Sequence, residues 1–194
     1  METGLIGLSG KPLHLGHWSL IERAAKENDR VLLFVSTTDR MRKGQITILG
    51  SDMHEIWKKY LIPILPSNIE ITLGGVPIRL IWEALGEANE GGSKDTFRIY
   101  SDPEDLAKRF GDDKLDKYVP ELNATGQIEG VPISREGGVD ISGTQMREFL
   151  ANNEKEQFLR YLPPVDPKAG EAIWNLLRSR LSESLLRDYI SLIV

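Results

Sequence analysis

Residues 3–36, TGLIGLSGKPLHLGHWSLIERAAKENDRVLLFVS, decide the fold of this chain. The stretch opens with an apolar run of strand length at residues 3–8. After a loop rich in glycine, proline and histidine, apolar residues take helical spacing over residues 17–28. A second apolar run at residues 31–36 does not alternate with polar residues, which is typical of a strand in a parallel sheet buried on both faces. Strand, helix and strand in this order predict a βαβ unit with parallel strands and a right-handed crossover.

The rest of the chain continues this alternation. The patterns predict further strands at residues 69–73, 96–100 and 127–134, and helices at residues 51–60, 77–89, 102–110, 142–152, 154–161 and 168–194. Ser51 is expected to cap its helix and Pro103 to lie in a first turn. We therefore expect a doubly wound α/β fold, Rossmann-like, with a mostly parallel sheet of about five strands. A main domain would span residues 1–163, and a C-terminal helical extension, residues 164–194, would pack on it or form an oligomer contact.

Composition restricts the classes of function. The chain has 194 residues, 40% of them hydrophobic, which is typical of a globular domain with a core. No apolar run is long enough to cross a bilayer, and the N-terminus lacks the features of a signal peptide. The absence of cysteine excludes disulfides, thiolate metal sites and cysteine nucleophiles. A net charge of -5 argues against general nucleic-acid binding but permits a local anion site. We expect a cytoplasmic protein with no membrane or nucleic-acid partner.

The loop at residues 9–17 is the predicted ligand site, because ligands of open α/β sheets bind beyond the carboxyl ends of the strands. It holds two of the three histidines, His14 and His17, which one helical turn would bring together. Gly16 lets the backbone approach a ligand, and the following helix start offers N–H groups to an anion. Lys11 adds a mobile positive charge. The alternatives are ordinary loop histidines or a metal pair, but the spacing shows no third metal ligand.

Two motifs carry a resemblance to a known superfamily. Residues 14–17, HLGH, resemble the HxGH signature of the nucleotidylyltransferases, which include nicotinamide mononucleotide adenylyltransferase, pantetheine-phosphate adenylyltransferase and glycerol-phosphate cytidylyltransferase. Residues 141–147, ISGTQMR, resemble the ISxTxxR motif of the same superfamily, and residues 99–102, IYSD, are a weaker match to a strand-end segment. The resemblance spans about residues 4–163 and is nearest to phage-encoded and related bacterial proteins whose acceptors are unassigned. Gly10 departs from the pattern, which often has phenylalanine there.

The resemblance implies a reaction and a set of site residues. An acceptor phosphate attacks the α-phosphorus of a nucleoside triphosphate in line and pyrophosphate leaves, so catalysis is mostly positioning and electrostatic stabilisation. The expected catalytic residues are His14, His17, Lys11 and Arg147, and the expected nucleotide-binding residues are Ser9, Gly10, Gly16, Ser142, Gly143 and Thr144.

Three further residues, Arg40, Lys43 and Asp102, are expected to contact the acceptor or the phosphates. The alternatives are a solvated charge run for the two basic residues and a helix cap for Asp102. Mg²⁺ is expected to accompany the triphosphate, held largely by phosphates and water, so the sequence need not show a metal site.

The resulting hypothesis is a nucleotidylyltransferase that moves a nucleoside monophosphate from a nucleoside triphosphate to a phosphorylated small-molecule acceptor. AMP is favoured over CMP because the SGTxxR form is closer to adenylyltransferases, and use of CTP is the alternative. A non-catalytic nucleotide sensor is a second alternative. A class I aminoacyl-tRNA synthetase would need a lysine-rich KMSKS-type loop and tRNA-binding domains, for which 194 residues leave little room. The acceptor and the pathway stay open, and a homodimer through the apolar tail is a further hypothesis.

Overall fold

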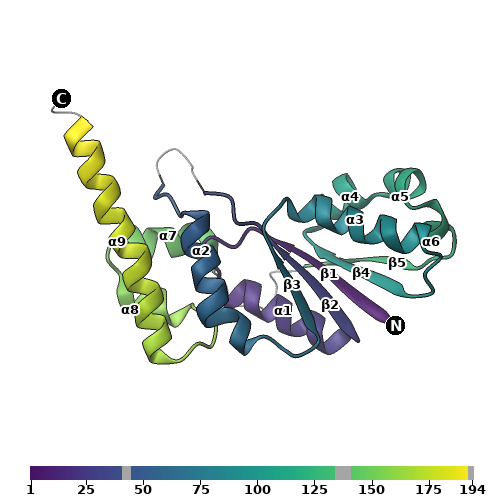
Figure 1. The fold of residues 1–194 in the computed structure, drawn as a ribbon, viewed down its shortest axis with the longest axis horizontal. Helices are drawn as coiled ribbons and strands as arrows, with labels where there is room; N and C mark the ends of the chain where they lie inside the picture. Colours follow the sequence, from purple (N-terminus) through teal and green to yellow (C-terminus); the bar gives the residue numbers. More distant parts are fainter. Residues whose placement is uncertain (41–44, 134–140, 192–194) are drawn as a thin grey trace. The chain divides into compact units, whose positions relative to one another are not determined.

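The computed structural model describes residues 1–40, 45–133 and 141–191, with side chains described as far as residue 179 (Figure 1). Two compact units make up the chain. The first contains residues 1–9, 19–36 and 66–139, and the second contains residues 10–18, 37–65 and 140–194. Helix α1 (Leu15–Glu27) gives its first turn to the second unit and the remainder to the first.

A parallel sheet forms the centre of the first unit. Its five strands lie in the order β3-β2-β1-β4-β5, and each neighbouring pair is parallel. The strands are β1 (Glu2–Leu8), β2 (Arg30–Val35), β3 (Ile69–Leu73), β4 (Thr96–Ser101) and β5 (Ile128–Pro132). The order places β1 at the middle of the sheet and β2 between β3 and β1, and most residues of β2 are buried, as its lack of alternation predicted. The expected α/β fold is confirmed.

Helices cover both faces of this sheet (Figure 1). On the face opposite α1 lie α3 (Pro77–Glu90), α4 (Pro103–Phe110), α5 (Asp112–Tyr118) and α6 (Pro120–Ala124). Buried side chains of the sheet and these helices form one cluster, which includes Leu5, Phe34, Ile81, Leu85, Phe97 and Ile99. Each such side chain contributes about 1.5–3 kcal/mol by leaving water, so this cluster fixes the sheet. The sequence predicted α3 and α4 but missed α5 and α6.

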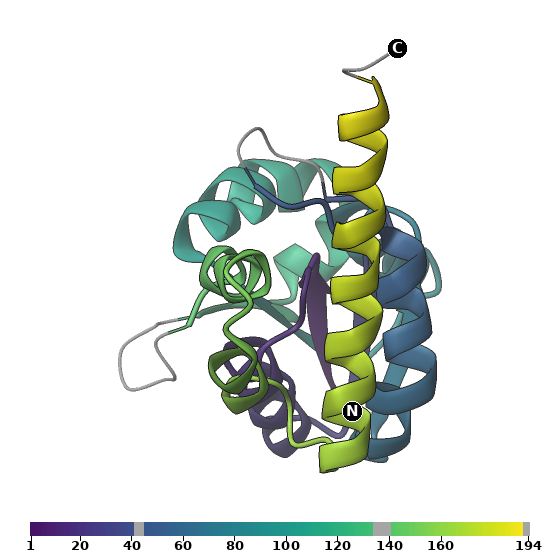
Figure 2. The same cartoon turned by 90° about the vertical axis from the view of Figure 1, so that its left-hand side faces the viewer.

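The second unit is helical in the part that the structure covers. Its helices are α2 (Gly50–Ile56), which continues as a π-helical turn (Trp57–Leu61) and a 3-10 turn (Ile62–Ile64), α7 (Gly143–Ala151), α8 (Lys155–Arg160) and α9 (Pro167–Ser191). Helix α9 contacts α2, α7 and α8, and Figure 2 shows α9 beside α2. Leu13, Met53, Ile56, Leu61 and Ile173 pack together as the apolar centre of this unit. No described helix is both long and apolar enough to cross a bilayer.

The start of α2 differs from the prediction. Ser51 is not its cap: the N-cap is Leu49, and the N–H of Gly50 donates to Asp39 Oδ1 at 2.8 Å. A Cβ atom at Gly50 would lie 1.6 Å from the carbonyl oxygen of Thr37, so the chain passes itself there too closely for any side chain. A carboxylate eleven residues earlier therefore caps the helix, which a local capping pattern does not predict.

Candidate functional site

The two predicted histidines lie together in the second unit. The ring centroids of His14 and His17 are 3.8 Å apart, with an angle of 33° between the planes. A Cβ atom at Gly10 would lie 2.9 Å from Leu13 Cδ1, so a larger residue there would displace Leu13, and it would make ordinary contact with Nδ1 of His17 at 3.5 Å. Gly10 thus lies where the loop packs closely on Leu13.

His17 is a neutral imidazole in this structure. Its pKa is lowered from 6.5 to about 3, first because burial disfavours the charged ring and second because His14 is adjacent. Its Nδ1 atom is buried and has no hydrogen-bond partner among the residues that the structure describes. Two charged rings at this separation would repel each other, so the pair favours a low charge. A bound phosphate would raise the pKa of His17 by attraction.

Acid is expected to destabilise the protein through His17. The unfolded chain binds a proton with a pKa of about 6.5, whereas the folded chain does so near pH 3. Between these values the unfolded state holds more protons, so the free energy of unfolding falls as the pH is lowered from about 6.5. His17→Asn removes this titration and should flatten the profile, which urea unfolding at several pH values measures. His54→Asn controls for loss of a histidine, and parallel profiles for wild type and His17→Asn would contradict the prediction.

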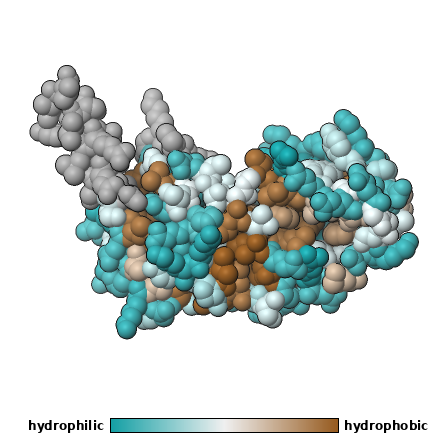
Figure 3. All heavy atoms as spheres, viewed as in Figure 1, coloured by the Kyte–Doolittle hydropathy of each residue, from teal (hydrophilic) through white to brown (hydrophobic). Residues whose placement is uncertain are grey.

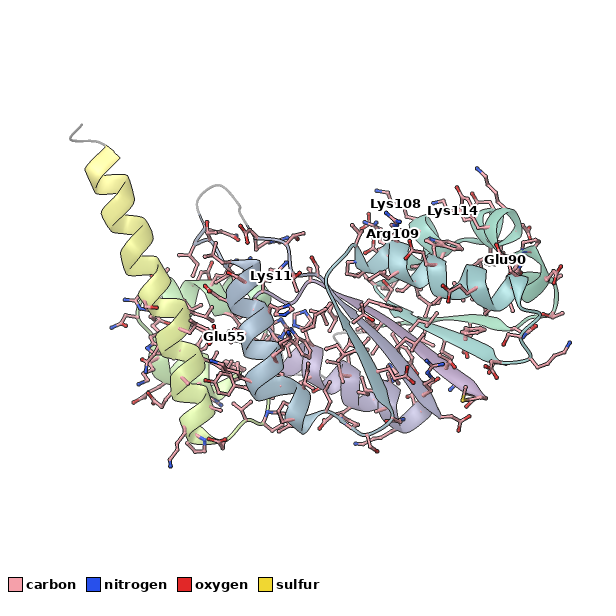
Figure 4. The ribbon with its side chains drawn as sticks, viewed as in Figure 1. Lys11, Glu55, Glu90, Lys108, Arg109 and Lys114 are labelled. Carbon is pink, nitrogen blue, oxygen red and sulfur yellow. The ribbon has the colours of Figure 1, made fainter. Side chains whose placement is uncertain are left out.

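Lys11 is buried rather than mobile. Its side chain is 6% exposed, and its Nζ atom donates to Thr38 Oγ1 at 3.4 Å. Burial, followed by the charge of Arg40, lowers the pKa of Lys11, while Asp39 opposes this shift. Figure 4 shows Lys11 beside α2. A hydrogen bond to Thr38, in the segment that follows β2, therefore holds the ammonium group of Lys11 in place. The Lys11 side chain would lose little conformational freedom if an anion bound beside it.

Arg147 joins the two motifs of the sequence. Its side chain is only 4% exposed, and all three of its nitrogens donate hydrogen bonds. Nη1 donates to the carbonyl oxygen of Lys11 at 2.9 Å, Nη2 to Thr144 Oγ1 at 3.0 Å, and Nε to Gln45 Oε1 at 3.0 Å. A Cβ atom at Gly143 would lie 3.3 Å from Nη1, so glycine leaves room for the guanidinium. The loop of the first motif and the helix of the second thus meet through one side chain.

Ser142 and Gln145 cap the start of α7. Ser142 Oγ accepts the N–H of Gln145 at 3.2 Å, and Gln145 Oε1 accepts the N–H of Ser142 at 2.8 Å, which completes a capping box. The remaining first-turn N–H groups, near Gly143 and Thr144, carry the positive end of the helix dipole. The second motif therefore fixes a helix start suited to an anion directly beside Arg147.

The start of α1, which lies in the first motif, offers fewer N–H groups to an anion than expected. The N–H of Leu15 donates to the carbonyl oxygen of Tyr161 at 2.9 Å, so the first amide of α1 is already engaged. Gly16 lies in the first turn of α1, which begins at Leu15, two residues before the predicted helix start at residue 17. Ser9, predicted to bind nucleotide, is exposed and belongs to the first unit.

The three predicted acceptor residues have different outcomes. Arg40 pairs with Ile48 through two backbone hydrogen bonds of 2.8 and 3.2 Å, and its charge acts on Lys11. Lys43 lies outside the described residues. Asp102 is exposed in the first unit and accepts the N–H of Glu104 at 2.9 Å, so it caps α4 as the alternative interpretation held.

Sequence reasoning missed Thr38 and Gln45, which hold Lys11 and Arg147. Both follow β2, in a stretch where only the basic residues Arg40 and Lys43 were predicted to contact a ligand. Neither residue belongs to a motif, and their contacts span 27 and 102 residues of sequence. The sequence contains one indication: both residues follow a parallel strand, and ligand sites of open α/β sheets lie beyond the carboxyl ends of such strands.

A separate groove of about 670 Å³ lies on the first unit, along α3, α4 and α5. Trp82 and Tyr118 lie in it beside Val76, which is 59% exposed, and Figure 3 shows hydrophobic surface at the start of α3. Arg109 and Lys114 line the groove and are labelled on α4 and α5 in Figure 4. Arg109 is paired with a carboxylate of its own helix. Among the residues that the structure describes, none that the sequence predicted for the site lines this groove.

Comparisons with known proteins support the fold. No family model matches the sequence, and no curated protein matches it. Among solved structures, the chain is similar to a protein from Vibrio parahaemolyticus assigned as a nicotinate-nucleotide adenylyltransferase, with a TM-score of 0.55 and 16% identity over 89% of this chain and 97% of that one. It is also similar to nicotinic acid mononucleotide adenylyltransferase of Plasmodium falciparum complexed with NaAD, with a TM-score of 0.51 and 15% identity over 84% and 91% of the two chains. At these identities the likeness shows the fold.

Proposed function

We propose that this protein is a nucleotidylyltransferase that transfers AMP from ATP to a phosphate-bearing small-molecule acceptor and releases pyrophosphate. One observation carries the proposal: the guanidinium of Arg147 donates to the carbonyl oxygen of Lys11, so the loop that carries the paired histidines is in direct contact with the helix that carries the ISGTQMR motif. This contact brings cations of the loop and of the helix close to the start of α7, and such a combination suits an anionic ligand.

The chemistry needs no protein nucleophile. An oxygen of the acceptor phosphate forms a bond to the α-phosphorus, and the bond from that phosphorus to the bridging oxygen of the β-phosphate breaks, so pyrophosphate leaves with its electron pair. Negative charge moves toward the leaving phosphates during this step. Preorganised donors at those oxygens therefore stabilise the transition state more than the ground state.

The described residues supply such donors. Lys11 and Arg147 bring positive charge that is already oriented by hydrogen bonds. His14 and His17 would donate N–H groups to the phosphates, and attraction by the triphosphate would favour protonation of the pair. The start of α7 adds backbone N–H groups and a favourable dipole. This combination matches the polyphosphate chain rather than a neutral ligand.

Mg²⁺ would enter with the triphosphate and neutralise part of its charge. Within the described ranges no group of three histidine, aspartate or glutamate side chains lies close enough to hold a metal ion. The donor set therefore fits an ion that is coordinated by phosphate oxygens and water, and the role of the chain's own cations is to bind the phosphates that carry it.

ATP is favoured over CTP on two grounds. The SGTxxR form of the second motif resembles adenylyltransferases more closely, and two solved structures of similar fold are described as adenylyltransferases. The structure from Plasmodium falciparum contains NaAD, a dinucleotide, so mononucleotides are the first acceptors to test.

The test is pyrophosphate release with ATP or CTP in combination with nicotinate mononucleotide, nicotinamide mononucleotide, phosphopantetheine and glycerol phosphate. We expect release with ATP and one class of phosphorylated acceptor, and a mass increase of that acceptor by one AMP. Calorimetry with each triphosphate runs in parallel. Tight triphosphate binding without release for any acceptor would favour the nucleotide sensor, and absence of triphosphate binding would overturn the proposal.

A further inference from the structure

Gln45 holds the arginine of the site from outside both motifs. Its Oε1 atom accepts the Nε–H of Arg147 at 3.0 Å. The other two acceptors of this guanidinium are the carbonyl oxygen of Lys11 and the hydroxyl of Thr144, which belong to the two predicted motif regions. Three acceptors on three sides fix both the position and the plane of the guanidinium. Gln45 supplies the third of them.

The segment that carries Gln45 is anchored by its own contacts. Ile48 is 2% exposed and pairs with Arg40 through two backbone hydrogen bonds. Asp39 accepts the N–H of Gly50, where the chain packs directly on Thr37. Gln45 itself is half-buried, and its Oε1 atom accepts from Arg147.

The chemical type of the acceptor matters as much as its position. A carboxamide oxygen accepts a hydrogen bond without bringing a charge, whereas a carboxylate in the same place would form a charge-assisted bond about twice as strong. Such a carboxylate would also repel phosphates that approach the same guanidinium. Thr38 also offers a neutral acceptor, its hydroxyl, to Lys11, although the Asp39 carboxylate lies close enough to act on that lysine as well. The acceptor that Gln45 gives to Arg147 is likewise uncharged.

We propose that Gln45 is a positioning residue for the nucleotidyl-transfer site: it fixes the plane of the Arg147 guanidinium with a neutral acceptor, so that this residue orients the arginine toward a triphosphate without adding negative charge beside it. The role toward the triphosphate rests on the proposed function, and the orienting contact with Arg147 stands on the hydrogen bond alone.

Two substitutions separate orientation from charge. Gln45→Glu keeps the acceptor and adds a carboxylate, and Gln45→Met keeps the length and removes the acceptor. Calorimetry with ATP and with inorganic tripolyphosphate should show at least ~10-fold weaker binding for Gln45→Glu, the scale of one close charge at intermediate dielectric. Gln45→Met should bind ATP within about 3-fold of wild type but lose turnover by ~10-fold, because a loosely oriented donor stabilises the transition state poorly.

The carboxylate introduced by Gln45→Glu should make the binding defect depend on pH, which a folding defect common to both variants would not do. The binding defect of Gln45→Glu relative to Gln45→Met should shrink as the pH is lowered toward about 4, because protonation returns a neutral acceptor. Gln157→Glu, at an exposed position of α8, adds the same charge and controls for net charge. Equal affinities of wild type and Gln45→Glu, or indistinguishable Gln45→Glu and Gln45→Met, would overturn the inference.

One measurement keeps this result distinct from failure of the proposed function. The ¹⁵Nε–H resonance of Arg147, recorded without ligand, should shift and exchange faster with water in Gln45→Met but not in Gln157→Glu. If wild type binds neither ATP nor tripolyphosphate, the proposed function and the role toward phosphates both fail. An unchanged resonance in Gln45→Met would show separately that Gln45 does not orient Arg147.

Discussion

His17→Ala is expected to lower the turnover number for pyrophosphate release by at least ~100-fold, the scale for losing one preorganised donor in a transition state. The ring of His17 packs 3.8 Å from that of His14 and lies against Gly10, so its position is set before any ligand binds. Charge that develops on the phosphates would meet this ring without further rearrangement. Alanine leaves the space to water, which must reorient during the reaction.

Matched variants make this result specific. His54→Ala removes the third histidine of the chain, which lies on α2, and should retain turnover within about 2-fold. His17→Asn restores an N–H donor of shorter reach and should recover part of the loss. The affinity for ATP should change less than turnover, because the donor acts mainly in the transition state. Near-normal turnover of folded His17→Ala would show that His17 does not act on the transferred phosphate.

Arg147→Ala is expected to lower the free energy of unfolding by about 3 kcal/mol and to abolish measurable triphosphate binding. The guanidinium is 4% exposed and donates to three separate parts of the second unit. Its removal leaves the carbonyl oxygen of Lys11 and the amide of Gln45 without this donor in a largely buried place. The same change deletes a positive charge from the proposed phosphate site.

Arg147→Lys separates these two effects. A lysine ammonium keeps the charge but cannot reach three divergent acceptors in one plane. It should recover part of the stability and some ATP binding, yet leave kcat/KM at least ~10-fold below wild type. Urea unfolding with and without ATP measures the stability and the ATP binding, because a ligand that binds only the folded state raises its stability. The pyrophosphate-release assay measures kcat/KM. Arg23→Ala, at an exposed helix pair, is the control, and wild-type kcat/KM in Arg147→Lys would refute the role of the planar donor.

The sheet was predictable because its signal is local. The apolar runs at residues 3–8 and 31–36 correspond to β1 and β2, and the intervening helical spacing corresponds to α1. Burial on both faces removes the need for polar residues, so such strands are visible in the sequence alone. The spacing of His14 and His17 is equally local, which is why their contact was foreseen.

The features that were missed depend on the tertiary structure. Helices α5 and α6 are short and meet at Val119, whose backbone is not helical, so no long periodic pattern exists. Asp39 caps α2 from eleven residues away, and buried Lys11 donates to Thr38, which lies 27 residues later in the sequence. No local sequence motif identifies Gln45, because its role depends on Arg147, which lies 102 residues later.

The bonds of Arg147 also determine when the site can exist. Its contacts with Lys11 and Gln45 close loops of 136 and 102 residues, among the largest that a chain of 194 residues can form. Closing such loops is entropically unfavourable until neighbouring elements have packed, so this junction should form among the last steps of folding. During synthesis the histidine loop leaves the ribosome long before its arginine does. The proposed nucleotide site should therefore be unable to form on a nascent chain until Arg147 has emerged.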